Sequence, residues 1–267
     1  MLLYNLLKIF MSFSFDLISD LHLETWNKRF DWEGQPTSQI CVVAGDISRD
    51  RALVIDALEQ LSEAYNVVLY IDGNVEHKDY YGHISQSYRE LQALIKPMSK
   101  VIFMQDNVVI INGVAFLGTN GWWGFDFDPA LAFDQSIYWF QDKENISQYD
   151  ALEIKAYAEH DATYMVNSIR KLQTQQDVKS IVIISHTVPA PWIISHDIEL
   201  VDTWRFNSMG NSLMLSALAG DTENKIKAWC FGHYYKPVEI TKNNISYVSN
   251  PRGKGDNITY YPKRITI

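Results

Sequence analysis

Five apolar segments of this sequence each end at side chains that can ligate a metal ion. In chain order these side chains are Asp20, His22, Asp46, Asn74, His186 and His233. The carboxyl ends of strands in an α/β sheet converge on one edge, where ligands commonly bind. An isolated Asp, Asn or His is more often a helix cap, a turn residue or a hydrogen-bonding partner. Their joint order and placement instead favour one shared metal site.

The spacing around these residues supports the same interpretation. One residue separates Asp20 from His22, and a glycine stands directly before Asp46, Asn74 and His233. Glycine lets the backbone turn sharply and brings a ligand close. Mixed nitrogen and oxygen donors suit Mn²⁺, Fe, Zn²⁺ or Ni²⁺ better than Ca²⁺ or Mg²⁺. We expect Mn²⁺ first among these.

The elements that must position the ligands follow from hydrophobic periodicity. The apolar segments have the length and composition of buried strands and are Ser12–Ser19, Ile40–Ala44, Val67–Ile71, Ser180–Ser185 and Ala228–Phe231. Helical spacing of apolar residues predicts helices over Arg51–Tyr65, Tyr81–Ile95 and Ala151–Leu172. Strands that alternate with helices are typical of an α/β fold.

Two pairs of short β-runs are predicted to form hairpins. Asn112-Gly113 stands between Val108–Ile111 and Val114–Leu117, and Asn243-Asn244 stands between Val238–Thr241 and Ile245–Val248. Both turn dipeptides tolerate the positive φ angles that tight hairpin turns require.

The chain shows no linker, repeat or low-complexity tract, so we expect one domain over residues 12–267. Residues 119–149 are irregular and rich in aromatic side chains. They are interpreted as a cap-like insertion over the site, with simple packing against the sheet as the alternative. Residues 1–11 are an apolar N-terminal extension without the features of a signal peptide, and we favour Met11 as the true start.

Composition restricts the classes of function. The 267 residues are 47% hydrophobic, with a formal net charge of -9. An acidic protein is poorly suited to broad attraction to extended nucleic acid. No segment has the roughly 20 apolar residues that crossing a bilayer requires. Cys41 and Cys230 lie in apolar runs without ligand spacing, which is typical of buried thiols in a reducing compartment. We therefore expect a cytoplasmic protein without a membrane partner.

The ordered blocks Asp-x-His, Gly-Asp, Gly-Asn-x-Glu, Ser-His and Gly-His closely resemble those of the calcineurin-like metallophosphoesterases. The resemblance spans about Phe13 to Ile267, and Ser249–Gly253 looks like the closing segment of small bacterial and phage members. It implies an α/β (α+β) fold, a four-layer αββα sandwich in which two mixed β-sheets are flanked by helices.

The resemblance also implies a ligand set for two metal ions. Asp20 and His22 would hold one ion, Asn74, His186 and His233 the other, and Asp46 would bridge both. Two cations about 3.5–4 Å apart can share a hydroxide and clamp the attacking and leaving oxygens at phosphorus. A carboxylate suits the bridge because each of its oxygens can face one cation.

Two positions depart from the family pattern. Val75 stands where the family usually has a histidine that protonates the leaving oxygen or stabilises charge on the phosphate. Tyr235 stands where the family has a histidine ligand to the Asp20 and His22 metal. Tyr235 either replaces that ligand as a phenolate, which favours Fe³⁺, or points away and leaves the position to water.

Two further residues are weaker candidates. His77 could substitute for the missing histidine, although a solvent-exposed or capping role is the favoured interpretation. Arg252 could bind a substrate phosphate through both guanidinium nitrogens, with a structural ion pair as the favoured alternative.

The function expected is hydrolysis of a phosphomonoester or phosphodiester of a small phosphorylated metabolite or nucleotide. The alternative is a degraded metal-site protein that binds a phosphate ligand or a partner without useful turnover. A nuclease of the same fold would need a basic track, and the sequence shows none.

Overall fold

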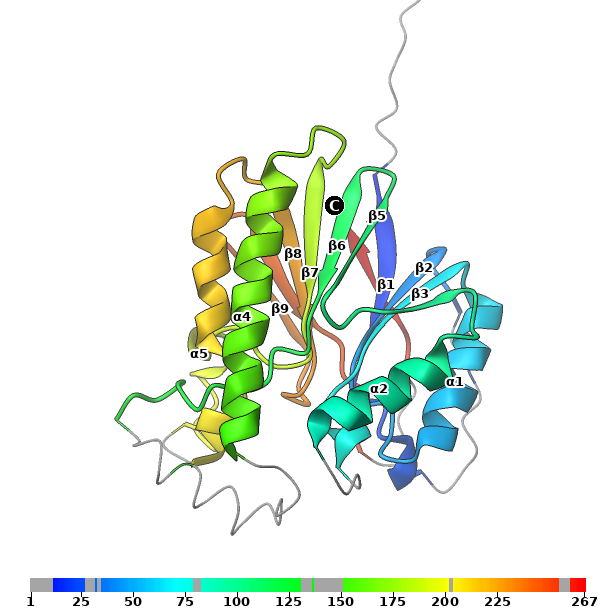
Figure 1. Cartoon of the computed structure of the whole chain (residues 1–267), viewed down its shortest axis with the longest axis horizontal. Coiled ribbons are helices and arrows are strands. Elements are labelled where there is room, and N and C mark those ends of the chain that lie inside the picture. Colours follow the sequence, from blue (N-terminus) through cyan, green and yellow to red (C-terminus); the bar gives the residue numbers. More distant parts are fainter. Residues whose placement is uncertain are drawn as a thin grey trace, which may run out of the picture.

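The chain forms two β-sheets packed face to face, with helices on both outer faces (Figure 1). The computed structural model describes residues 12–26, 32, 35–78, 83–130, 136, 151–201, 204–254 and 260–267. Both sheets are mixed, and the predicted arrangement of two mixed sheets flanked by helices is confirmed.

The first sheet has the strand order β11-β1-β2-β3-β4. Its strands are β1 (Ser14–Ile18), β2 (Ile40–Ala44), β3 (Val67–Ile71), β4 (Val101–Phe103) and β11 (Lys263–Thr266). The strands β1 to β4 are parallel, and β11 pairs with the free edge of β1 in the antiparallel sense.

The second sheet has the order β5-β6-β7-β8-β10-β9. Its strands are β5 (Asn107–Ile111), β6 (Val114–Gly118), β7 (Ser180–Ile184), β8 (Ile226–Phe231), β9 (Val238–Lys242) and β10 (Ile245–Ser249). The inner strands are parallel, and the hairpin partners β5 and β9 are antiparallel at the two edges.

Side chains that alternate along the strands supply three apolar layers. On β1, Phe15 and Leu17 face the other sheet, where Phe116 of β6 lies in the same buried cluster. The opposite face of the first sheet packs under α1 (Arg51–Ala64) and α2 (Ile84–Ile95). The outer face of the second sheet packs under α4 (Ala151–Gln173). Both faces of each sheet are thus covered, so the parallel strands consist of continuous apolar runs.

The predicted hairpins are confirmed by their turn geometry. Asn112 and Gly113 have φ angles of 51° and 82°, and Asn243 and Asn244 have 53° and 62°. Left-handed conformation at both central positions is the form that matches the twist of the paired strands.

Several short elements were not predicted. They are β11, α5 (Pro191–Ile194) and the 3-10 helices η1 (Leu23–Thr25), η2 (Val75–His77), η3 (Trp204–Ser208) and η4 (Ser212–Gly220). Segments this short, or with three residues per turn, do not carry an α-helical or strand repeat long enough to recognise.

Three sequence predictions fall wholly or partly outside the described residues. These are the N-terminal extension, the predicted start of the second helix at Tyr81, and residues 131–135 and 137–149 of the aromatic-rich segment. Among the helices that the structure describes, none combines the length and the hydropathy that crossing a membrane requires.

We predict that Phe116→Ala lowers the free energy of unfolding by about 3–5 kcal/mol, because it leaves a cavity between the sheets. The Phe116 ring is fully buried and meets Phe15 edge to face at 5.3 Å. The matched control is Ile110→Ala on the neighbouring strand, where the side chain is 41% exposed. Its expected loss is below about 1 kcal/mol. Urea titration followed by tryptophan fluorescence measures both, and equal losses would contradict this account of the core.

Candidate metal centre

The predicted ligands come together at the carboxyl ends of strands from both sheets. Potential ligand atoms of Asp20, His22 and Asp46 lie within 4.8 Å of one another, and so do those of Asp46, His186 and His233. Asp46 belongs to both groups. The geometry therefore supplies two adjoining sites that share one carboxylate, and a carboxylate can bridge two cations.

The turns that carry these ligands are held in an uncommon backbone conformation. Asp20, His22, Asp46 and His233 have φ angles of 51°, 46°, 56° and 68°. A non-glycine residue in the left-handed region costs about 1–3 kcal/mol in this kind of setting and tends to occur at functional sites. The turns aim each side chain across the strand end toward the shared centre.

Each histidine is oriented by a hydrogen bond at one ring nitrogen. The Nδ1 of His22 lies 3.1 Å from a carboxylate oxygen of Glu24. The Nδ1 of His186 lies 2.9 Å from the carbonyl oxygen of Ala44. In His233 the bonded nitrogen is Nε2, 3.1 Å from the carbonyl oxygen of Ser208. Donation from one nitrogen fixes the tautomer and leaves the other nitrogen with a lone pair for a metal.

Several potential metal-ligating atoms of these residues are buried and make no hydrogen bond. Among the described residues, Asp20 Oδ2, His22 Nε2, Asp46 Oδ2 and His233 Nδ1 lack a hydrogen-bonding partner. Buried polar atoms are almost always paired, since each unpaired one costs about 1–3 kcal/mol. Four such acceptor atoms around a shared carboxylate fit a pair of cations, which would satisfy all of them.

Asn74 and His186 complete the second group. Asn74 Oδ1 lies 3.2 Å from His186 Nε2, and the same nitrogen lies 3.4 Å from Asp46 Oδ1. These three potential ligand atoms therefore lie close together at the ends of β2, β3 and β7. The family resemblance implied these residues as ligands of the second metal ion, and that assignment stays a prediction.

The electrostatics of the centre prepare these groups for a cation. Burial raises the pKa of Asp46, but His186, His22 and His233 outweigh it and hold that pKa below its usual value. Burial, reinforced by His186, lowers the pKa of His233 to about 3. Burial also raises the pKa of Asp20 to about 6. At neutral pH, Asp46 is therefore ionised and His233 neutral, the states in which each can ligate a metal.

Glu76 ties the turn after β2 to the turn after β3. Its buried carboxylate accepts hydrogen bonds from the backbone N–H groups of Ile47 at 2.7 Å, Gly73 at 2.8 Å and Asp46 at 3.2 Å. In return, the N–H of Val75 donates to Asp46 Oδ1 at 2.9 Å. The Asp46 carboxylate thus has little freedom to rotate.

The aromatic segment contributes to the site through Trp123. Its ring stacks on the ring of His233, with centroids 5.6 Å apart and planes 20° from parallel. The segment is anchored by Asp161 of α4, which accepts the N–H groups of Gly121 at 2.8 Å and Trp122 at 3.2 Å. The described part of the predicted insertion therefore lies against a proposed metal ligand.

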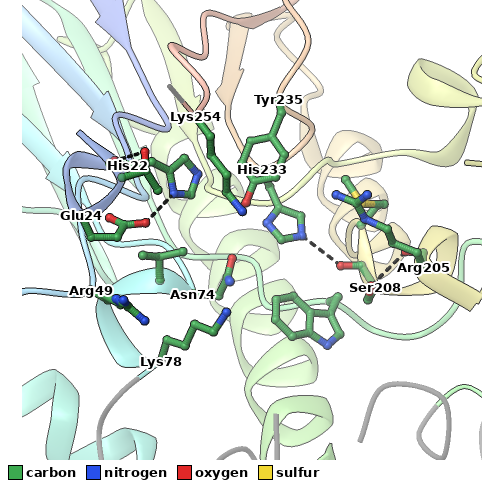
Figure 2. A pocket seen from close by; sticks show the side chains of 14 residues that line it. His22, Glu24, Arg49, Asn74, Lys78, Arg205, Ser208, His233, Tyr235 and Lys254 are labelled. Atoms are coloured by element: carbon green, nitrogen blue, oxygen red, sulfur yellow. Dashed lines mark hydrogen bonds and ion pairs between the residues drawn. The ribbon is translucent and has the colours of Figure 1, made fainter. Parts of the chain in front are cut away.

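A pocket of about 290 Å³ opens over the centre. Figure 2 shows His22, Asn74, His233 and Tyr235 directed into it from different segments. The Tyr235 ring lies 5.0 Å from the ring of His22, and burial raises the pKa of its phenol well above the usual value. Tyr235 is close enough to the first ligand group to act there, and its ligation of a metal stays a prediction.

The exposed or capping role expected for His77 is wrong. The His77 ring is buried, and its two nitrogens lie 2.7 Å from Asp72 Oδ2 and 2.7 Å from Ser87 Oγ. The short η2 helix turns the side chain inward, away from the residues that line the pocket. A positioning role behind the turn of Asn74 suits this geometry better than catalysis.

Arg252 is also buried and not among the residues that line the pocket. Its guanidinium lies over the ring of Trp26 and donates to the carbonyl oxygens of Leu21 at 3.3 Å and Gly253 at 3.1 Å. The backbone N–H groups of Arg252 and Gly253 donate to Ser19 and Asp20. The segment after β10 therefore fastens the turn that carries Asp20.

The sequence analysis assigned no role to several residues that shape the site. They are Glu24, Glu76, Trp123, Asp161 and Ser208. Two of these had a local signal, because Glu24 and Glu76 each lie two positions after a predicted ligand. The contact of Ser208 with His233 spans 25 positions of the chain, and no local pattern indicates it.

Among the comparisons with known proteins, the one with solved structures identifies the fold. No family model and no curated protein matches the sequence. Phosphopantetheinyl hydrolase from Mycobacterium tuberculosis aligns with a TM-score of 0.70 over 94% of this chain and 95% of its own, at 14% identity. A dimetal phosphatase from Danio rerio aligns over 89% of this chain and 86% of its own at 13% identity, with a TM-score of 0.49. The first alignment shows a shared fold.

We predict that Gly73→Ala removes metal binding while the chain still folds. A Cβ atom at Gly73 would collide with Asp46 Oδ1 and lie 2.7 Å from His186 Cε1, so both ligands must move. We expect less than half of the wild-type metal content after equilibration with Mn²⁺, measured by mass spectrometry.

The control for this prediction is Gly220→Ala. Its added Cβ would meet atoms only at ordinary distances of 3.4 Å and 3.6 Å. Wild-type metal content in the Gly73 variant would contradict the close packing proposed at the shared carboxylate.

Proposed function

We propose that this chain, which has the calcineurin-like metallophosphoesterase fold, is a metal-dependent phosphoesterase. The proposal rests on the set of unpaired acceptor atoms gathered around the carboxylate of Asp46. A pair of divalent cations requires oxygen and nitrogen ligands of this number and kind. Mn²⁺ is the favoured ion, with Fe, Zn²⁺ and Ni²⁺ as alternatives. The substrate class is a small phosphomonoester or phosphodiester, including nucleotides.

When bound, two cations would polarise the phosphoryl oxygens and lower the pKa of a bound water. The residues of the chain would position the cations and the substrate. Asp46 would contribute ligand atoms to both cations, and Asn74 lines the pocket beside them. Trp123 and Met209 contribute apolar surface to the lining of the pocket.

Val75 lines the pocket at the position where the family pattern has histidine. Its side chain can neither donate a proton nor hydrogen bond to a phosphate. Loss of a general acid typically lowers a rate by about 10²–10⁴. Substrates whose leaving group needs no proton, such as nitrophenyl esters, should therefore be hydrolysed best.

The same observation favours one alternative function. A chain with Val75 and Tyr235 in the pocket could bind metal and a phosphate ligand without useful turnover. A nuclease is a weaker candidate because the net charge of -9 opposes binding to a long polyanion.

We predict that Asp46→Asn abolishes hydrolysis of bis-p-nitrophenyl phosphate in Mn²⁺, lowering kcat by more than about 10³. An amide cannot offer an anionic oxygen to each of two cations. The matched control is Asp177→Asn, which makes the same change at an exposed position and should leave kcat unaltered. Turnover retained by the Asp46 variant would contradict the bridging role. No turnover in wild type would favour the alternative of a binding protein.

We predict that Val75→His raises kcat/KM for phenyl phosphate by at least about tenfold and has a smaller effect on p-nitrophenyl phosphate. Phenolate is the poorer leaving group and gains more from protonation. Assays of both esters across pH test this. Equal changes for the two esters would show that position 75 does not lie beside the leaving oxygen.

A further inference from the structure

The pocket above the metal centre has the opposite charge to the protein as a whole. Of the described residues that line it, four are cationic and one, Glu24, is acidic. The cations, which we call the collar, are Arg49, Lys78, Arg205 and Lys254. Elsewhere acidic groups dominate, since the chain carries a net charge of -9. The single carboxylate is engaged by Nδ1 of His22.

The collar is assembled from separate parts of the chain. Arg49 follows β2, Lys78 follows η2, Arg205 belongs to η3 and Lys254 follows β10. Figure 2 shows Lys254 reaching between the rings of His22 and His233, and Lys78 directed toward Asn74 from the opposite side. Arg205 stands beyond His233 in the same view. Cations from distant segments of the chain thus line one pocket.

The charge of the collar reaches the centre. The ammonium of Lys254 lies 5.5 Å from the ring of Tyr235. A substrate seated over the metal ligands would therefore lie within the field of these side chains.

A single phosphate group bound at the metal centre would not neutralise the positive charge of the collar. Two divalent cations in the centre would be balanced by Asp20, Asp46 and the dianion of a single phosphomonoester. The four collar cations would remain in addition, and Glu24 is the one acidic residue among the described residues that line the pocket. A second phosphate on the substrate would neutralise the collar, and Arg and Lys side chains are the usual partners of phosphate oxygens.

We propose that the collar is a subsite for a second phosphate, so that the preferred substrates are small molecules bearing two phosphate groups. This inference rests on the proposed function for the position of the scissile group. The pocket volume of about 290 Å³ is suited to a nucleotide-sized ligand.

A matched pair of chromogenic substrates tests the subsite. Thymidine 5′-(p-nitrophenyl phosphate) and its 3′-phosphorylated form release the same leaving group and differ by one phosphate. We expect a kcat/KM preference of at least about tenfold for the second, decreasing as ionic strength rises toward about 0.5 M. Arg205→Gln and Lys254→Gln should each reduce the preference several-fold. Lys171→Gln removes the same charge from an exposed position on α4 and should leave the preference intact.

Binding separates this inference from the proposed activity. Calorimetry on the Mn²⁺-loaded protein compares thymidine 3′,5′-bisphosphate and thymidine 5′-diphosphate with the 5′-monophosphate. Tighter binding of either doubly phosphorylated ligand, weakened by Arg205→Gln, would support the subsite even if no ester were hydrolysed. Equal affinities for all three ligands, or a preference unchanged in Arg205→Gln and Lys254→Gln, would overturn it even in an active phosphoesterase.

Discussion

The buried carboxylate of Asp46 is the group around which the two halves of the site are organised. It is charged, inaccessible to water and surrounded by imidazoles from both sheets. A buried charge is tolerated only when opposite charges and hydrogen bonds compensate for the lost hydration. Here His186, His22 and His233 hold the pKa of Asp46 below its usual value, and the N–H of Val75 donates a hydrogen bond to its carboxylate. Without these neighbours the buried charge of Asp46 would be less stable, so its position depends on several surrounding segments of the chain.

The fold supplies that fixation by bringing strand ends into contact. The N–H of Asp20 donates to the carbonyl of Gly45, and the N–H of Gly232 donates to the carbonyl of His186. A Cβ atom at Gly232 would lie 2.6 Å from Asp20 Oδ2, so the two sheets can approach this closely only where that side chain is missing. Glu76 then joins the turns after β2 and β3. The ligands are therefore positioned by backbone contacts as well as by their own rotamers, and such preorganisation is what a metal site with a defined geometry requires.

The collar and Val75 together shape the chemistry that such a centre could perform. The collar concentrates positive potential where the rest of the surface is acidic, and a cleft of one sign attracts an oppositely charged substrate. Val75 lines the same pocket at the position where the family pattern has histidine, and valine cannot donate a proton. Recognition would then depend on charges at the rim, and the reaction would depend on the metal centre and on the leaving group. This division is consistent with a substrate whose recognition groups lie away from the scissile bond.

The clustering of the candidate ligands could be predicted from the sequence because their positions follow from local rules. An apolar run makes a strand and parallel strands end at one edge. Within three positions of the end of such a run stand Asp20, Asp46, Asn74, His186 and His233. The same local rules located both hairpins, through Asn112-Gly113 and Asn243-Asn244. They failed for His77, because the turn of η2 buries its side chain.

Only the tertiary structure decided which ring nitrogen of His186 and of His233 faces the centre. The partner of His186 is the carbonyl of Ala44, 142 positions away, and the partner of His233 is the carbonyl of Ser208, 25 positions away. The tertiary structure also decided that Trp123 covers His233 and that cations from four separate segments line one pocket. Such contacts depend on how distant segments pack, and local propensity and periodicity contain no information about them.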